Sequence, residues 1–158
     1  MPRKYLSDTG ADKCIFCRIV AGEAPAVKLF EDERVLGFLD IRPLRPGHAL
    51  VIPKRHCRDL RDCPPEDLAP LLAACRSLAP ALLEATGSDG FNLIASNGEA
   101  AGQEVFHLHF HLMPRRSGDG FTRIAFAESV ARARRAELDE LSAMGDSIRA
   151  AWRGQGGS

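Results

Sequence analysis

Residues 104–114 read EVFHLHFHLMP and carry the clearest pattern in the sequence. Polar and apolar side chains alternate along it, which is the pattern of a half-buried β-strand. His107, His109 and His111 are therefore expected to point to one face, each about 7 Å along the strand from the next, while the apolar residues between them face the core. Pro114 is expected to end the strand, because proline has no N–H to donate.

The three histidines are informative as a set. The chain has five histidines, and three of them alternate within this one short stretch. A single histidine on a strand is usually structural, but imidazoles titrate near neutral pH and repel one another when charged. Three in register would weaken a sheet unless a metal, a phosphate or a reaction used them. The triple therefore indicates a functional site.

The composition is that of an ordinary globular protein. At 158 residues the chain is long enough for one domain with a real core. Lys and Arg together number 21, as do Asp and Glu, so no nucleic-acid or membrane-surface partner is expected. No apolar run is recognised as long enough to span a bilayer, and no signal peptide is recognised at the N-terminus. A cytoplasmic protein is therefore expected.

Apolar patterning predicts four more strands and two main helices. The leucines of the first helix recur at three- and four-residue spacing, which is typical of a packed helix face. The strands are expected at residues 26–31, 35–40, 48–53 and 91–96, and the helices at about 62–86 and 127–152, with a short helical or turn segment at 14–21.

Cys14 and Cys17 form a Cys-x-x-Cys pair. In a reducing compartment such a pair favours a metal or redox role over a disulfide. A redox role needs a preceding strand and a βαβ pattern, and neither is visible. Together with His56 and one histidine of the triple, the two cysteines could form a Cys₂His₂ zinc site, although the long spacings match no zinc finger.

Residues 107–113 match the His-φ-His-φ-His-φ-φ motif that names the histidine triad (HIT) family of nucleotide hydrolases and transferases. Other stretches resemble the same family in the same order: residues 14–19, 38–41, 46–54 with His56, and 97–103. The chain is thus similar to HIT proteins, and to their zinc-containing bacterial branch, over roughly residues 14–121.

The resemblance implies an α+β fold with a five-stranded antiparallel sheet, a long helix, a short N-terminal helix and a homodimer. The chain would then consist of a flexible arm (1–13), a HIT domain (14–121) and a C-terminal helical extension (122–158). A sheet with one main helix leaves part of its surface uncovered, so the leucine-rich segment 68–83 is the expected two-fold contact.

The resemblance also implies a nucleotide site. His109 would attack the phosphate, and His48 would orient the triad from behind. Asp40 would bind the ribose hydroxyls; Ile15, Phe16, Ile19, Phe38 and Leu50 would enclose the base; and Ser96, Gln103 and His111 would surround the phosphate. A structural zinc would be held by Cys14, Cys17, His56 and His107.

The implied chemistry suits these residue types. A neutral imidazole is a good nucleophile at pH 7 and a good leaving group once phosphorylated. A hydrogen bond from one nitrogen of His109 to the backbone carbonyl of His107 is expected to fix its tautomer and leave the other nitrogen free to attack. The expected activity is hydrolysis at the α-phosphate through a nucleotidyl-histidine, with a dinucleoside polyphosphate or a purine nucleoside phosphoramidate as substrate. Two positions depart from the family pattern: Glu104 replaces the phosphate-contacting serine of the phosphoramidase branch, and Ser96 stands where relatives often carry an amide.

Two other functions stay open at the level of sequence. The first is a nucleotide-binding regulatory protein with little turnover, which Glu104 and the C-terminal extension would suit. The second is a metal-dependent hydrolase in which His107, His109 and His111 all bind one catalytic zinc.

Overall fold

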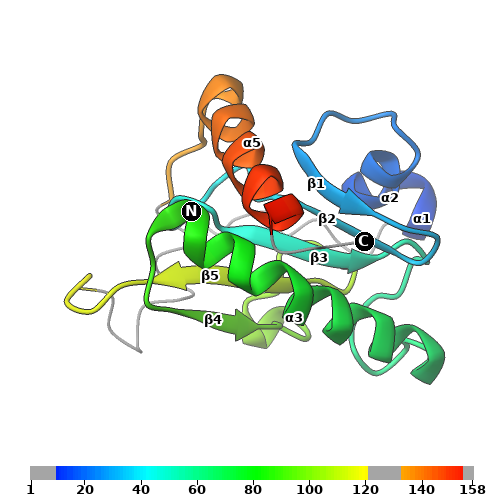
Figure 1. Ribbon diagram of the computed structural model, residues 1–158. Coiled ribbons are helices and arrows are strands. Elements are labelled where there is room, and N and C mark those ends of the chain that lie inside the picture. Colours follow the sequence, from blue (N-terminus) through cyan, green and yellow to red (C-terminus); the bar gives the residue numbers. More distant parts are fainter. Residues whose placement is uncertain (1–9, 121–132, 155–158) are drawn as a thin grey trace.

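The computed structural model describes residues 10–120 and 133–154 (Figure 1). The helices are α1 (Gly10–Lys13), α2 (Ile15–Val20), α3 (Pro65–Thr86), the 3₁₀ turn η1 (Glu99–Ala101) and α5 (Leu138–Gly154). The strands are β1 (Lys28–Glu31), β2 (Val35–Leu39), β3 (Ala49–Pro53), β4 (Gly90–Ile94) and β5 (Phe110–Arg115). They form one sheet in the order β1-β2-β3-β5-β4, and every neighbouring pair is antiparallel. The predicted α+β fold with five antiparallel strands is confirmed.

The central strands are covered on both faces. In β2 and β3 every residue is buried, and successive side chains alternate between two apolar clusters. Val35 and Val51 belong to the cluster built with α3 and α5. Leu36 and Ile52 belong to the cluster built with α2. Figure 1 shows α3 running along one face of the sheet with α5 beside it, and α2 near the β1–β2 end.

Leucines on one side of α3 pack this helix against the rest of the core. Leu71, Leu78 and Leu82 are fully buried against the sheet and α5. The helix ends where expected, at Gly87, whose φ of 60° suits a residue without a Cβ. By length and composition α3 is apolar enough to cross a membrane, which the sequence reading had not recognised. The core helix of a globular protein meets the same criterion, and Leu71, Leu78 and Leu82 of this helix lie in the core.

The histidine strand is shorter at one end and longer at the other than the pattern predicts. β5 begins at Phe110, so His107 and His109 precede it. The intervening Leu108 donates its N–H to the carbonyl of Cys57 instead of a strand partner, at 2.7 Å. At the other end Pro114 lies inside β5 opposite Phe91, so the prediction that it ends the strand is wrong. The pairing of β5 with β3 stops at Leu112, so Pro114 has a strand partner only on the β4 side, where proline is tolerated.

The predicted C-terminal helix begins later than expected. Residues 133–137 are not helical, and α5 starts at Leu138. Residues 127–132, the first part of the predicted helix, lie outside the described residues. Ala136 donates its N–H to the carbonyl of Ile41 at 2.8 Å, which draws this segment to the end of β2. At the N-terminus, residues 10–13 of the predicted arm form the single turn α1, and residues 1–9 lie outside the described part.

Candidate active site and metal centre

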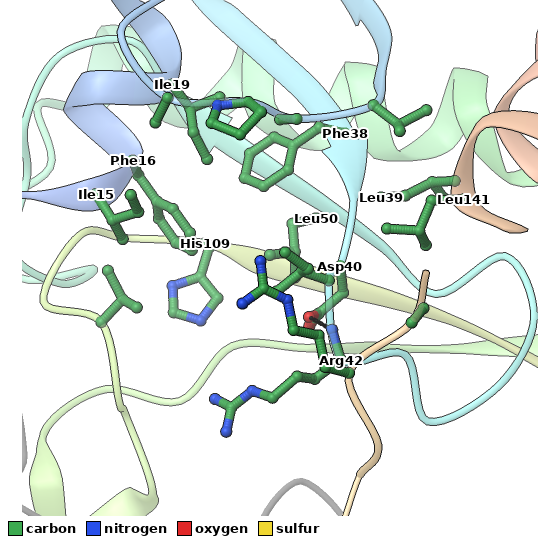
Figure 2. A pocket seen from close by; sticks show the side chains of 18 of the residues that line it. Ile15, Phe16, Ile19, Phe38, Leu39, Asp40, Arg42, Leu50, His109 and Leu141 are labelled. Carbon is green, nitrogen blue, oxygen red and sulfur yellow. Dashed lines mark hydrogen bonds between the residues drawn. The ribbon is translucent and has the colours of Figure 1, made fainter. Parts of the chain in front are cut away.

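A cavity of about 630 Å³ opens beside the end of β2 (Figure 2). Its apolar part is formed by the α2-side cluster, and it contains every residue expected to enclose a base: Ile15, Phe16, Ile19, Phe38 and Leu50. Its polar part is lined by Asp40, Arg42, Glu104, His109 and His111. A cavity of this size that is mostly apolar, with a few convergent polar groups, is typical of a small-molecule site.

His109 is held in one orientation by the backbone. Its Nδ1 lies 2.7 Å from the carbonyl oxygen of His107, the contact that the sequence predicted. A carbonyl only accepts, so Nδ1 carries the hydrogen and Nε2 keeps its lone pair. Burial lowers the pKa of His109, which keeps the ring neutral at pH 7. The ring of Phe16 packs edge-on against it at 5.3 Å. His109 therefore offers a neutral, pre-oriented nucleophile to the cavity.

His48 fixes the tautomer and orientation of His111. The N–H of Leu44 donates to Nδ1 of His48 at 3.2 Å, so neutral His48 carries its hydrogen on Nε2. That group donates to Nδ1 of His111 at 2.9 Å. His111 is left with its own N–H on Nε2, as a hydrogen-bond donor. Burial lowers the pKa of both rings, so the arrangement is uncharged at neutral pH.

Asp40 stands beside this pair. Its Oδ2 lies 3.7 Å from Nε2 of His48 and 4.0 Å from Nδ1 of His111. The three side chains are close enough to converge on a metal ion. However, Nδ1 of His48 already accepts a hydrogen bond, so Nε2 has no lone pair for a metal while the ring is neutral. The group therefore orients His111 and presents a carboxylate to the cavity. Figure 2 shows the ring of His109 between Phe16 on one side and Asp40 and Arg42 on the other.

A second group of side chains that could bind one metal ion includes His107, the first residue of the histidine segment (residues 107–111). The ligand atoms of four side chains are all within 4.8 Å of one another: Cys14, Cys17, His56 and His107. Cys17 Sγ lies 3.2 Å from Nδ1 of His56, and both sulfurs lie 3.5 Å from Nδ1 of His107. In a tetrahedral zinc site the bond lengths require sulfur and nitrogen ligands to be about 3.5 Å apart. The four residues therefore fit a tetrahedral metal ion such as zinc.

The electrostatics also favour a cation at this position. Burial, with Cys14 next, raises the pKa of the Cys17 thiol to about 12, so two adjacent thiolates need a positive charge between them. Burial lowers the pKa of His107 to about 4, which keeps its lone pair available. Its other nitrogen, Nε2, donates to the carbonyl of Pro53 at 2.8 Å, the outer contact that metal-binding histidines usually make.

These contacts exclude one of the functions left open by the sequence. Nδ1 of His107 faces the two cysteines, and Nδ1 of His109 faces a backbone carbonyl. Among the residues that the structure describes, the three triad histidines do not form a convergent group. A single catalytic zinc bound by all three is therefore wrong.

Two expected phosphate contacts are not part of the cavity lining. Neither Ser96 nor Gln103 lines it. Gln103 is only 1% exposed, and its amide is already bonded: it accepts from the N–H of Gly98 at 2.7 Å and donates to the carbonyls of Arg58 and Val105 at 2.7 and 3.1 Å. The side chain shapes the loop that leads to the triad, and its predicted contact with phosphate stays untested.

The cavity also contains residues that the sequence reading missed. Arg42 lies two residues after Asp40, and that short spacing was a usable signal. Further missed residues come from the loop before β1, from the end of β2 and from the segment before the triad: Ala24, Pro25, Ala26, Val27, Leu39, Ile41, Gly102 and Val105. A last group comes from the C-terminal segment: Arg135, Ala136, Glu137, Leu138 and Leu141. No local motif marks them, because only the packing of α5 beside the sheet brings this segment to the cavity (Figure 2).

The fold and the site define a class of α+β proteins in which histidines beside a five-stranded antiparallel sheet face a small-molecule cavity. The chain belongs to the HIT family: a family model described as "HIT domain" matches residues 21–118. Among solved structures, a zinc-bound histidine triad family protein from Mycobacterium smegmatis is similar with a TM-score of 0.79. It is 42% identical, and the match covers 93% of this chain and 98% of that one, which includes much of the C-terminal extension.

Two curated relatives carry named activities. The chain is 45% identical over 116 residues to adenylylsulfatase HINT3 of Arabidopsis thaliana, a match that covers 73% of this chain and 59% of that protein. It is also 45% identical over 103 residues to adenosine 5'-monophosphoramidase HNT1 of Saccharomyces cerevisiae, covering 65% of this chain and 63% of that protein. The chain thus spans about three fifths of the length of each.

Proposed function

We propose that this protein hydrolyses nucleotides at the α-phosphate through a covalent nucleotidyl intermediate on His109, and releases a nucleoside monophosphate. The observation that carries the proposal is the 2.7 Å contact between Nδ1 of His109 and the carbonyl of His107. It leaves Nε2 as a lone-pair donor on a neutral ring at the boundary between the apolar and polar parts of the cavity. The names of the two relatives, an adenylylsulfatase and an adenosine 5'-monophosphoramidase, support chemistry on an adenosine phosphate.

Different parts of the cavity fit different parts of the proposed substrate. A purine base is flat and mostly apolar, and it fits the apolar part bounded by Phe16 and Phe38, whose rings meet edge-on at 5.4 Å. The carboxylate of Asp40 accepts hydrogen bonds from the ribose hydroxyls. Base and ribose then place the α-phosphate against His109, so binding energy remote from phosphorus orients the reacting atoms.

The reaction proceeds in two displacements. In the first, the Nε2 lone pair of His109 forms a bond to phosphorus, and the bond to the leaving group breaks with its electron pair. The N–H on Nε2 of His111 donates to a phosphate oxygen or to the departing atom. In the second, a water oxygen attacks phosphorus, the P–N bond breaks, the electron pair returns to His109, and the water proton is released.

The metal centre belongs to the proposal as a structural element. Zinc held by the four ligands described above would cross-link α2, the segment after β3 and the start of the histidine segment, and would stabilise the fold. His107 is then committed to the metal, which leaves the chemistry to His109 and His111. A homodimer in the cytoplasm, with no nucleic-acid or membrane partner, completes the proposal.

Nucleoside monophosphate release tests the proposal. The zinc-loaded protein is supplied with adenosine 5'-phosphoramidate and, separately, with a diadenosine polyphosphate. We expect turnover of at least one of them, and a loss of at least about 10³-fold in His109→Ala with nucleoside monophosphate affinity within a few-fold of wild type. Tight nucleotide binding without turnover of either substrate would instead favour the regulatory nucleotide-binding protein.

A further inference from the structure

An ion pair lies in the polar part of the cavity. Nη2 of Arg42 contacts Oε2 of Glu104, and both residues line the same cavity as His109. The side chains are partly open, with 38% and 29% of their surfaces exposed, so both charges face solvent and ligand. Asp40 fixes the backbone beneath Arg42, since its Oδ1 accepts the Arg42 N–H at 2.8 Å.

The position of this ion pair follows from the proposed substrate pose. The base occupies the apolar part of the cavity, and the phosphate lies against His109. The remaining substituent of phosphorus, the leaving group, then points into the polar part, which Arg42, Glu104 and Gly102 line.

We propose that the Arg42–Glu104 ion pair selects substrates by the charge of their leaving group. This inference rests on the proposed function. When the bond to phosphorus breaks, an anionic leaving group such as a nucleotide phosphate departs with added negative charge beside the Glu104 carboxylate, which repels it. An amine or ammonia leaves with its electron pair and takes up a proton from the Nε2–H of His111, which regains one from water, so it departs without negative charge. Glu104 therefore favours nitrogen leaving groups over anionic ones, and Arg42 moderates that preference.

The two residues are predicted to act in opposite directions, although they form one contact. Replacing Glu104 removes the repulsion and frees the Arg42 guanidinium to attract an anionic leaving group. Replacing Arg42 leaves the carboxylate unneutralised and increases the repulsion. If the ion pair only held the two loops together, both replacements would break the same contact and affect turnover in the same way.

The test uses the full-length zinc-loaded protein and two substrates that share the adenylyl group. The measured quantity is kcat/KM for adenosine 5'-phosphoramidate divided by kcat/KM for a diadenosine polyphosphate. We expect Glu104→Gln to lower this ratio about tenfold, which is the size of a like-charge interaction across a partly hydrated gap. Arg42→Gln is expected to raise it by a similar factor. Glu104→Ala serves as a second variant that removes the charge with a different side chain.

A matched control lies in the same loop. Glu99 is an acidic residue of η1 that does not line the cavity, so Glu99→Gln removes one negative charge nearby and is expected to leave the ratio unchanged. The inference is overturned if Glu104→Gln and Arg42→Gln move the ratio in the same direction, or if Glu104→Gln leaves it unchanged while turnover persists. A wild-type protein that turns over neither substrate would instead overturn the proposed function, and this inference with it.

Discussion

The backbone, not another side chain, selects the tautomer of His109. The sequence was sufficient to predict this contact with the carbonyl of His107, because residues two apart in an extended segment place a side chain over a neighbouring carbonyl. The partner of His111 could be named only through the family resemblance, because His48 is 63 residues away. The amide of Gln103 shows the opposite case: the family resemblance implied a phosphate ligand, while loop geometry uses every donor of the amide internally.

His48 makes stability depend on pH in a defined direction. Burial lowers the pKa of His48 below its ordinary value of about 6.5, so below that pH the unfolded chain binds more protons than the folded one. The contribution of His48 to the free energy of unfolding should therefore be fully present above about pH 6.5. It should be lost as the pH drops toward the pKa of His48 in the folded state. In His48→Gln, whose amide can still bond Leu44 and His111, the slope between about pH 5 and 6.5 should be smaller by up to about 1.4 kcal/mol per pH unit.

The measurement is urea unfolding of both zinc-loaded proteins across this pH range. Titration of the metal ligands is common to the two proteins and cancels in the difference. Identical slopes in wild type and His48→Gln would show that His48 does not stay neutral in the folded state.

At the scale of elements, the candidate metal ligands come from three separate segments of the chain. Cys14 stands just before α2, His56 follows β3, and His107 begins the histidine segment. Helix α2 has only six residues, too few to be stable alone, and its inner face forms the apolar part of the cavity. The metal ligands therefore also position the surface on which the base is proposed to lie.

Cys14→Ser should remove this support. We expect the zinc content to fall from one ion per chain to a small fraction, and the free energy of unfolding to fall by about 3–5 kcal/mol. Turnover by the protein that remains folded should fall much less, because the metal takes no part in the proposed chemistry. Metal analysis and chemical unfolding, each with and without chelator, check this.

Two internal controls accompany the Cys14 experiment. Chelator should lower the stability of wild type toward that of Cys14→Ser and leave the variant unchanged. Cys75→Ala changes a buried cysteine outside the cluster and should retain zinc. Equal zinc content in wild type and Cys14→Ser would exclude the proposed ligand set.

The boundaries of an element were predicted well where the local sequence sets them, and poorly where contacts between distant residues set them. The strands β2 and β3 are covered on both faces, and their boundaries were predicted within about one residue from apolar content and turns. The start of β5 was missed because the bond from Leu108 to Cys57 joins residues 51 positions apart. The start of α5 was missed for a similar reason. The N–H of Ala136 bonds to the carbonyl of Ile41, far away in the sequence, and the helix begins only after this segment, at Leu138.

On the scale of the whole molecule, the predicted two-fold contact needs revision. The leucine-rich segment of α3 was expected to cover a partner, but Leu71, Leu78 and Leu82 are buried in the core of their own chain. In that segment Leu72 is exposed, at 49%. Two exposed apolar side chains lie together on β4, the last strand in the sheet order, where Phe91 and Leu93 are 39% and 41% exposed. An edge strand with exposed apolar side chains is a surface that proteins normally cover.

The homodimer is therefore predicted to form through β4. Light scattering at micromolar concentration should give twice the chain mass of 17.2 kDa. Leu93→Lys, which places a charge on the exposed edge, should shift the equilibrium toward monomer with little change in the stability of the fold. A wild-type protein that scatters as a monomer would rule out the dimer.

If His109 is the nucleophile, a nucleotidyl intermediate can be trapped on it. Wild-type protein turning over a substrate labelled at the α-phosphate is quenched in denaturant, and the acid-labile adduct is mapped by mass spectrometry at neutral or alkaline pH. We expect one nucleotidyl group on His109 of the wild type, and none in His109→Ala. Label on His111, or near wild-type turnover in His109→Ala, would contradict this assignment of the nucleophile.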